Sequence, residues 1–225
     1  MPFFNVIRWV AWKDFISEVR SRETLSSMFF FALIVILVFS FSFSMDQQAA
    51  QELIAGIMWV AFTFTGIIGL GKSFSAELQN DSLENLQISP TSKGAIFLGK
   101  LAANLLFMLA VEIILFPLFV IFFNLNVVEA LPVLLLVFAL ATLGLSTVGT
   151  LFSAMTVQVR AREVMLPILL LPLAVPVMIA AVESTRGALS GSPLSLYSNW
   201  LQLLGVFDVV FTVLSFWAFE WILDT

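Results

Sequence analysis

Six long stretches of this 225-residue chain contain almost no charged residues, and each is long enough to cross a bilayer as a helix. A transmembrane helix needs about 20 mostly apolar residues. Only 11% of the residues are charged and 60% are apolar, which leaves too little polar surface for a soluble globular domain. The sequence therefore predicts an all-α polytopic membrane protein with six transmembrane helices: between Glu23 and Asp46, between Glu52 and Lys72, Leu101 to Val128, Ala130 to Val159, between Glu163 and Glu183, and Gly205 to Leu223.

The basic residues predict how these helices are oriented. Nine of the ten lie before the first stretch, between the second and third, or between the fourth and fifth, and only Arg186 lies elsewhere. Because lysine and arginine accumulate in cytoplasmic loops, these three regions are expected to be cytoplasmic. Both termini are then cytoplasmic, and residues 1–225 form a single transmembrane domain.

The N-terminal segment, residues 1–23, has the pattern of an elbow helix that lies flat in the cytoplasmic interface. One face carries apolar residues and the other carries mostly polar ones. Such a helix places tryptophan rings at the depth of the lipid headgroups. Membrane anchoring and contact with a partner protein both fit this pattern. The apolar face holds Trp9, Trp12, Phe15, Ile16 and Val19, and the polar face holds Lys13, Asp14, Ser17, Arg20 and Ser21.

A second interfacial helix is expected in the outer loop, residues 183–204. Ser192 and Pro193 match an N-cap followed by proline in the first turn. The apolar residues Leu194, Tyr197, Leu201 and Leu204 follow at helical spacing. A segment that only closes the bundle fits the same residues.

Several kinds of chemistry are not expected of this chain. It contains no cysteine and no histidine, so thiolate and imidazole ligands or nucleophiles are excluded, and no catalytic, cofactor or metal residues are predicted. Residues 66–73 match the written P-loop pattern, but they end a membrane helix and lack the preceding strand that a nucleotide site requires. Ala61, Thr65 and Gly69 instead form a small-residue face for helix packing. The chain is therefore not expected to hydrolyse ATP by itself.

The cytoplasmic loop 72–100 carries the strongest functional pattern. Between Glu77 and Pro90, an apolar stripe that includes Leu83 and Leu86 runs along a short predicted helix. Acidic residues, among them Glu84, flank this stripe. A short amphipathic helix held between two membrane spans could fit a groove in a soluble partner and move the spans with it. Docking on its own bundle is the alternative interpretation.

The residues of this loop resemble the coupling helix of ABC-2-type exporter permeases. The shared pattern is E-x-x-N-x-(S/T)-L-E-x-L-x-x-(S/T)-P, closed by Gly99-Lys100, although Asp81 stands where those permeases usually carry glycine. Over nearly the full length, the chain is similar to the haem exporter protein B family (CcmB) of cytochrome c maturation. The matching segments are Lys13-Asp14, residues 20–24, residues 96–105, Val111-Glu112, residues 116–118, residues 162–164 and the proline-spaced residues 166–176.

This resemblance implies the permease subunit of an ABC complex in the bacterial cell inner membrane. The implied partners are an ABC ATPase subunit that contacts Glu77, Leu83, Glu84, Leu86 and Pro90, a haem-handling membrane subunit, a haem chaperone and membrane lipid. Two copies per complex and no nucleic acid are expected, and haem and ATP are expected to be bound by the partners. The alternatives are another ABC-2-type exporter, an assembly scaffold that transports nothing, and a secondary transporter.

Glu112 is an acidic residue deep in the third stretch and is the intramembrane polar candidate. A charge there costs about 2.5 kcal/mol or more, so the side chain is expected to face the bundle interior. We predict a neutral acid that is hydrogen-bonded to a hydroxyl of the fourth stretch, which offers Thr142, Ser146, Thr150 and Ser153. A proton relay is the alternative role.

Overall fold

The computed structural model describes residues 3–20, 22–42, 47–74, 92–157, 159 and 161–222. These residues fold almost entirely as helices. In chain order they are α1 (Phe3–Arg20), α2 (Arg22–Ser42), α3 (Gln47–Leu70), α6 (Lys93–Phe123), α7 (Leu131–Thr156), α8 (Arg162–Leu189), the 3₁₀ turn η1 (Leu194–Leu196) and α9 (Ser198–Ile222).

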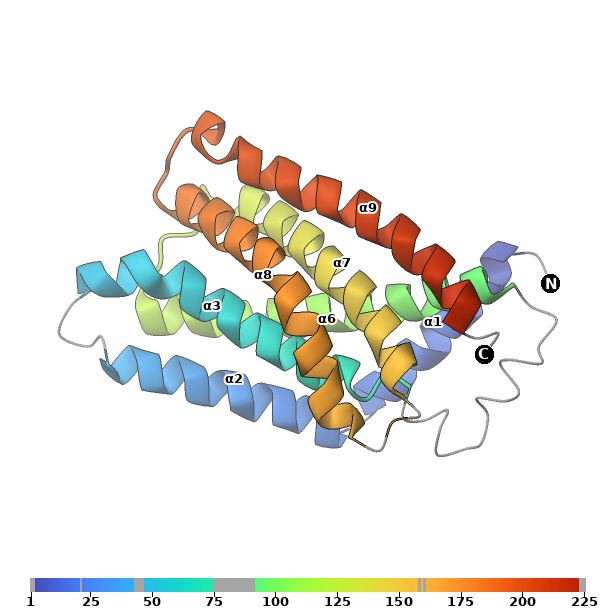
Figure 1. The fold of residues 1–225 in the computed structure, drawn as a ribbon. Helices are drawn as coiled ribbons and strands as arrows, with labels where there is room; N and C mark the ends of the chain where they lie inside the picture. The colour runs from blue at the N-terminus through green and yellow to red at the C-terminus, as the bar shows by residue number, and fades with distance from the viewer. Residues whose placement is uncertain are drawn as a thin grey trace.

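Six of these helices, α2, α3, α6, α7, α8 and α9, are long and apolar enough to cross a membrane, judged by length and composition. This confirms the predicted fold class. The six helices run side by side along one direction, and the start of α1 and the end of α9 lie at the same end of the bundle (Figure 1). That arrangement fits an even number of spans. Which end faces the cytoplasm stays a prediction.

The start of α6 differs from the expected boundary. The sequence placed residues 93–100 in the cytoplasmic loop, but α6 already begins at Lys93, with Ser92 as its N-cap. The Ser92 hydroxyl accepts a hydrogen bond from the backbone N–H of Ala95 at 3.4 Å. Lys100, which the sequence suggested as the end of a loop, is therefore inside the helix and only 1% exposed. Its long side chain is buried because it has partners there.

The outer segment 183–204 also differs from expectation. α8 continues to Leu189 and α9 begins at Ser198, so the predicted interfacial helix is reduced to the single turn η1 before α9. Pro193, not Ser192, occupies the N-cap position of this turn. The Tyr197 ring packs over Gly187, where an added Cβ would lie 2.4 Å from a ring carbon. This contact holds the segment against α8.

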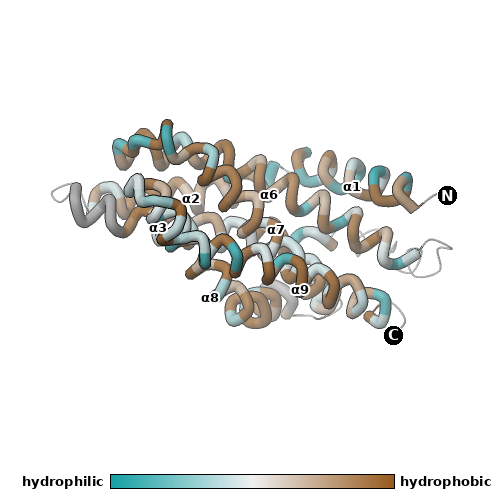
Figure 2. Tube along the Cα trace, turned by 90° about the horizontal axis from the view of Figure 1, so that it is seen from above, coloured by the Kyte–Doolittle hydropathy of each residue, from teal (hydrophilic) through white to brown (hydrophobic). Residues whose placement is uncertain are grey.

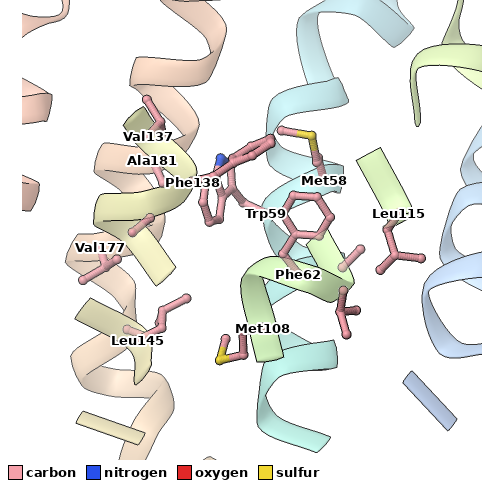
Figure 3. Packing of buried hydrophobic residues seen from close by; sticks show 14 of the residues in the cluster. Met58, Trp59, Phe62, Met108, Leu115, Val137, Phe138, Leu145, Val177 and Ala181 are labelled. Atoms are coloured by element: carbon pink, nitrogen blue, oxygen red, sulfur yellow. The ribbon is translucent and has the colours of Figure 1, made fainter. Parts of the chain in front are cut away.

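The core lies around α3, the most enclosed of the spans. The Trp59 ring packs edge-on against Phe62 and Phe138, with centroid distances of 5.7 and 5.8 Å. Figure 3 shows these rings between α3 and α7. The indole N–H of Trp59 donates to the Thr185 hydroxyl of α8 at 2.9 Å, so its polar tip is satisfied in an apolar core.

α1 packs along the beginning of α6. Gly99 allows this close approach, because a Cβ at that position would lie 2.7 Å from the Cβ of Val10. The face of α1 toward the bundle therefore includes Val10, while Trp9 and Trp12, from the predicted apolar face, remain exposed. Figure 2 shows hydrophobic and hydrophilic residues alternating along α1, whereas the spans are mostly hydrophobic.

Candidate functional site

One face of α6 carries a buried side chain with a nitrogen, oxygen or sulfur atom at every fourth position from residue 100 to residue 112. Lys100, Asn104, Met108 and Glu112 are each at most 6% exposed. Because residues four apart lie one above the other on a helix, these four side chains form a continuous stripe, here called the α6 stripe. α6 begins at the end of the bundle where the chain termini lie (Figure 1). Lys100 is seven residues from the start of α6 and therefore near this end, whereas Glu112 lies about three turns farther along the helix.

The middle of the α6 stripe pairs with hydroxyl side chains of α7. The Asn104 side-chain amide donates to the Thr150 hydroxyl at 2.8 Å. One turn farther along, the Ser146 hydroxyl donates to the Met108 sulfur at 3.3 Å. The numbering rises on α6 and falls on α7, as expected for antiparallel neighbours, so each turn of one helix meets a turn of the other.

The next pair on the α6 stripe is Glu112 with Thr142. The Thr142 hydroxyl lies 2.7 and 2.9 Å from the two carboxyl oxygens of Glu112 and donates to them. Within the described parts of the chain, no basic side chain pairs with Glu112. These surroundings provide a hydrogen bond but no opposite charge, so they suit the neutral carboxylic acid better than the carboxylate. Thr142 is one of the four hydroxyl residues that the sequence proposed as partners.

A small cavity adjoins Glu112 on the side of α3. Its volume, about 10 Å³ for the centre of a water molecule, is near the minimum needed to hold one water. The buried Thr65 hydroxyl lines it and has no hydrogen-bond partner among the described residues. The cavity is far smaller than the roughly 300–1,000 Å³ of typical ligand pockets, so a haem does not fit there. The lining residues are Met28, Phe62, Thr65, Gly66, Met108, Val111 and Glu112.

The opposite end of the α6 stripe is a cluster of charged and aromatic groups around Lys100. The Lys100 ammonium forms a 2.9 Å ion pair with Asp14 of α1 and donates to the Ser73 carbonyl at 3.3 Å. It also lies 4.2 Å from the centre of the Phe74 ring, a favourable cation–π distance. Asp14, Ser73, Phe74 and Lys100 are here called the Lys100 clasp. The clasp joins α1, the chain just after α3, and α6.

The end of α3 has a second attachment. The Ser153 hydroxyl of α7 donates to the Leu70 carbonyl at 2.7 Å. Leu70 is the last residue of α3, and its carbonyl also accepts a hydrogen bond from the Ser73 backbone N–H at 3.1 Å, in the turn that follows the helix. The Ser153 and Lys100 side chains thus both donate to backbone carbonyls at the end of α3. These two hydrogen bonds attach the chain at residues 70–74 to α7 and to α6.

The predicted docking residues lie just beyond this fixed point. Phe74 is part of the Lys100 clasp, and Ser92 caps α6, so the two ends of segment 75–91 are both attached to the bundle. The segment itself lies outside the described residues. The assignment of Glu77, Leu83, Glu84, Leu86 and Pro90 to a docking surface therefore stays a prediction.

Asp208 of α9 is a second buried acid, which the sequence analysis did not select as a site residue. It is 5% exposed, and one of its carboxyl oxygens has no hydrogen-bond partner among the described residues. The other oxygen lies 2.8 Å from where a Cβ on Gly144 would be. Gly144 therefore provides the space that this carboxyl group occupies between α7 and α9. An acidic residue within an apolar stretch was the available sequence signal.

The P-loop-like residues 66–73 are helical up to Leu70 and then form a turn. Gly66 faces Met108, and Gly69 lies against Met28, which is helix packing with no strand before it. In the part of the chain that the structure describes, no group of three or more acidic residues could hold a metal ion. The contacts of residues 66–70 are therefore those of packing between neighbouring helices.

Comparison with known proteins identifies relatives over nearly the whole chain. Residues 5–224 match the family model described as CcmB protein. A curated relative named Heme exporter protein B, from Pseudomonas aeruginosa, is 31% identical over 193 residues, covering 86% of each chain. Proteins of the same name from Escherichia coli K12 and Haemophilus influenzae are 32% and 29% identical, covering 86% and 87% of this chain and 88% and 86% of their own.

Proposed function

Because this chain belongs to the CcmB protein family, we propose that it is the permease subunit of an ABC complex that serves haem export in cytochrome c biogenesis. The chain is a multi-pass inner membrane protein and a component of a haem export system. The finer proposal is that a separate ATPase subunit docks on segment 75–91, whose predicted amphipathic helix carries Leu83 and Leu86. ATP hydrolysis in that subunit then moves the membrane helices.

The Lys100 clasp is the observation that carries this proposal. A docking segment can transmit movement only if its ends are firmly attached to the spans. Here the chain before the segment is held by Lys100 and Ser153, and the chain after it continues directly into α6. Asp14 extends the same attachment to α1. Displacement of the segment would therefore act on α1, α3, α6 and α7 together.

The α6 stripe supplies a route for that movement into the membrane. Lys100 lies on the same helix face as Asn104, Met108 and Glu112, and the last three contact α7 at successive turns. Hydrogen bonds between these helices can be exchanged at low cost, because each is worth only about 0.6 kcal/mol on average in a membrane. A bundle with two arrangements of α6 and α7 could then be biased by nucleotide in the partner.

The proposed mechanism leaves haem with other subunits. This chain has no histidine or cysteine to ligate haem iron, and the cavity next to Glu112 has room for about one water. We propose that the nucleotide-driven change in the bundle releases a loaded haem chaperone from a haem-handling membrane subunit. Two copies of the chain would serve two ATPase subunits.

Substitutions on the predicted apolar stripe of segment 75–91 test whether the ATPase subunit docks there. Leu83→Glu or Leu86→Glu adds a charge to the apolar stripe of segment 75–91 without changing the membrane spans. Membrane insertion should therefore survive, while co-purification with the ATPase subunit is lost. Gln87→Glu, which adds the same charge at a position outside both the apolar stripe and the fixed residues of the pattern, is the matched control and should still co-purify. The measurements are the recovered ATPase subunit and cytochrome c maturation in cells.

The outcomes separate the competing functions. An assembly scaffold should support maturation even when the partner's ATP hydrolysis is blocked, whereas the ABC permease should not. A secondary transporter should work without any ATPase subunit. If Leu83→Glu and Leu86→Glu both co-purify the ATPase at the level of Gln87→Glu, the docking surface is misassigned.

A further inference from the structure

A groove of about 580 Å³ lies between α1 and α6, outside the α6 stripe. Five of its six lining residues come from α1, and the sixth, Leu106, comes from α6. We propose that this groove binds one anionic phospholipid, with its phosphate on Arg8 and an acyl chain along Leu106. The lining residues are Arg8, Trp9, Ala11, Trp12, Phe15 and Leu106.

Arg8 is the first reason for an anionic ligand. Arg8, Trp12 and Phe15 follow one another at positions i, i+4 and i+7, so the guanidinium lies within the aromatic face of α1. The acid of this helix that pairs with a buried base, Asp14, faces the other way, toward Lys100. In the described part of the chain, Arg8 forms no ion pair. An arginine in apolar surroundings is well suited to a phosphate.

The two tryptophans are the second reason, and they indicate a lipid. Trp9 and Trp12 are 61% and 60% exposed. Tryptophan is enriched where the headgroups meet the acyl chains, since its ring is apolar and its N–H is polar. A small soluble anion would leave these rings uncovered, and an uncharged apolar molecule would leave Arg8 without a counter-ion. A phospholipid with a net negative charge satisfies both.

The surface beyond the groove is the third reason, because it continues as an apolar path. On α6, Ile113, Ile114 and Ile121 follow Leu106 at i+7, i+8 and i+15, and they are 59%, 60% and 72% exposed. Residues at this spacing share one side of a helix. An acyl chain that passes Leu106 can therefore continue along α6 into the hydrocarbon layer. α1 and α6 pack against each other, and Figure 2 shows the two helices side by side.

Native mass spectrometry of the purified full-length protein tests the proposal, with phosphatidylglycerol as the probe and phosphatidylethanolamine for comparison. Wild type should bind one phosphatidylglycerol more tightly than phosphatidylethanolamine. Arg8→Gln should weaken phosphatidylglycerol binding about fivefold, as expected for one basic residue at a phosphate. Arg20→Gln removes the same charge from an exposed position of α1 outside the groove, so its affinity should match wild type.

A second measurement locates the acyl chain and does not depend on the Arg8 variant folding. Phosphatidylglycerol with brominated acyl chains should quench the fluorescence of wild type, and excess unlabelled phosphatidylglycerol should reverse part of that quenching. The reversible part should disappear in the Trp9→Phe/Trp12→Phe variant.

Two outcomes would overturn the proposal. One is equal phosphatidylglycerol binding by wild type, Arg8→Gln and Arg20→Gln, which would mean that only general lipid contact exists. The other is loss of a dimer by Arg8→Gln in detergent free of phospholipid, which would assign this surface to a second copy of the chain.

Discussion

The two ends of the α6 stripe each bury an ionisable side chain, but they differ in the partners that stabilise it. Lys100 and Glu112 are both buried ionisable residues on one face of one helix, 1% and 3% exposed. Lys100 has an opposite charge at 2.9 Å, a backbone carbonyl and an aromatic ring. Among the described residues, Glu112 has the Thr142 hydroxyl as its one hydrogen-bond partner, beside a cavity the size of a water molecule.

The different partners of Lys100 and Glu112 indicate where in the bundle a buried side chain can be charged. Near the end of the bundle, an ion pair can join elements that are far apart in sequence, since Asp14 and Lys100 are separated by 86 residues. Farther into the span, the partners are hydroxyl groups on a neighbouring helix, which suit a neutral acid. The first end is therefore expected to be sensitive to loss of a single charge, and the second end to loss of hydrogen-bonding capacity. Substitutions at four positions test this contrast.

The largest effect is expected at the Lys100 clasp. Asp14→Asn removes the carboxylate that lies 2.9 Å from the buried Lys100 ammonium, which should lower the free energy of unfolding by about 3–5 kcal/mol. Thermal unfolding in detergent and protein level in the membrane measure this effect. Glu183→Gln is the matched control, because it breaks the exposed Glu183–Arg186 pair on α8 and should cost less than about 1 kcal/mol. Similar losses for both variants would contradict the assignment of a buried ion pair.

A smaller loss is expected when α1 is pushed away from the clasp. Gly99→Ala would place a Cβ 2.7 Å from that of Val10, and the resulting overpacking should cost about 1–3 kcal/mol. Gly56→Ala is the control within another helix, since no atom lies within 4 Å of its added Cβ, and it should be neutral or stabilising. The comparison uses the unfolding temperature of both variants. An unfolding temperature for Gly99→Ala equal to or above that of wild type would mean that α1 is not closely seated.

At the Glu112 end of the α6 stripe, the hydrogen-bonding capacity of the substituted side chain should matter more than its charge. Glu112→Gln keeps the volume and hydrogen-bonding capacity and should be nearly silent. Glu112→Leu leaves Thr142 without its partner and should cost on the order of 1 kcal/mol. Cytochrome c maturation, measured together with protein level, should tolerate glutamine better than leucine. A Glu112→Gln protein that is present at normal level but inactive would favour the proton relay instead.

The sequence predicted the parts of this contrast that depend on composition and local spacing. The six spans follow from apolar stretches, and a hydroxyl partner for Glu112 on the fourth span follows from the need to satisfy a polar group within a membrane. The sequence offered four such hydroxyls, and the structure selects Thr142. The pairing of Asn104 with Thr150 was not predicted. The four-residue spacing of Lys100, Asn104, Met108 and Glu112 was the signal that could have identified it.

The parts that could not be predicted depend on contacts between distant segments. Asp14 was placed on the polar face of an interfacial helix because nothing nearby in sequence indicates Lys100 as its partner. Lys100 was placed at the end of a loop, since a lysine beside an apolar stretch usually anchors a span at the interface. Its burial becomes clear only when α1 and the chain after α3 are both brought to it.

The smallest expected effect tests the cavity beside Glu112. Thr65→Val replaces a hydroxyl that lacks a hydrogen-bond partner among the described residues with a methyl group of similar size. If the cavity is dry, this change removes an unsatisfied polar group and should be neutral or slightly stabilising. If a water bridges Thr65 and Glu112, the same change should destabilise the protein, because that water loses a partner.

Thr63→Val is the matched control, since Thr63 is also a buried threonine of α3 with no partner in the described chain and does not line the cavity. The measurement is the unfolding temperature of both variants, alone and combined with Glu112→Gln. A destabilising effect of Thr65→Val that differs from that of Thr63→Val and depends on residue 112 would place a water between α3 and the α6 stripe. The Glu112 end would then be hydrated rather than dry, and the contrast with the Lys100 clasp would narrow.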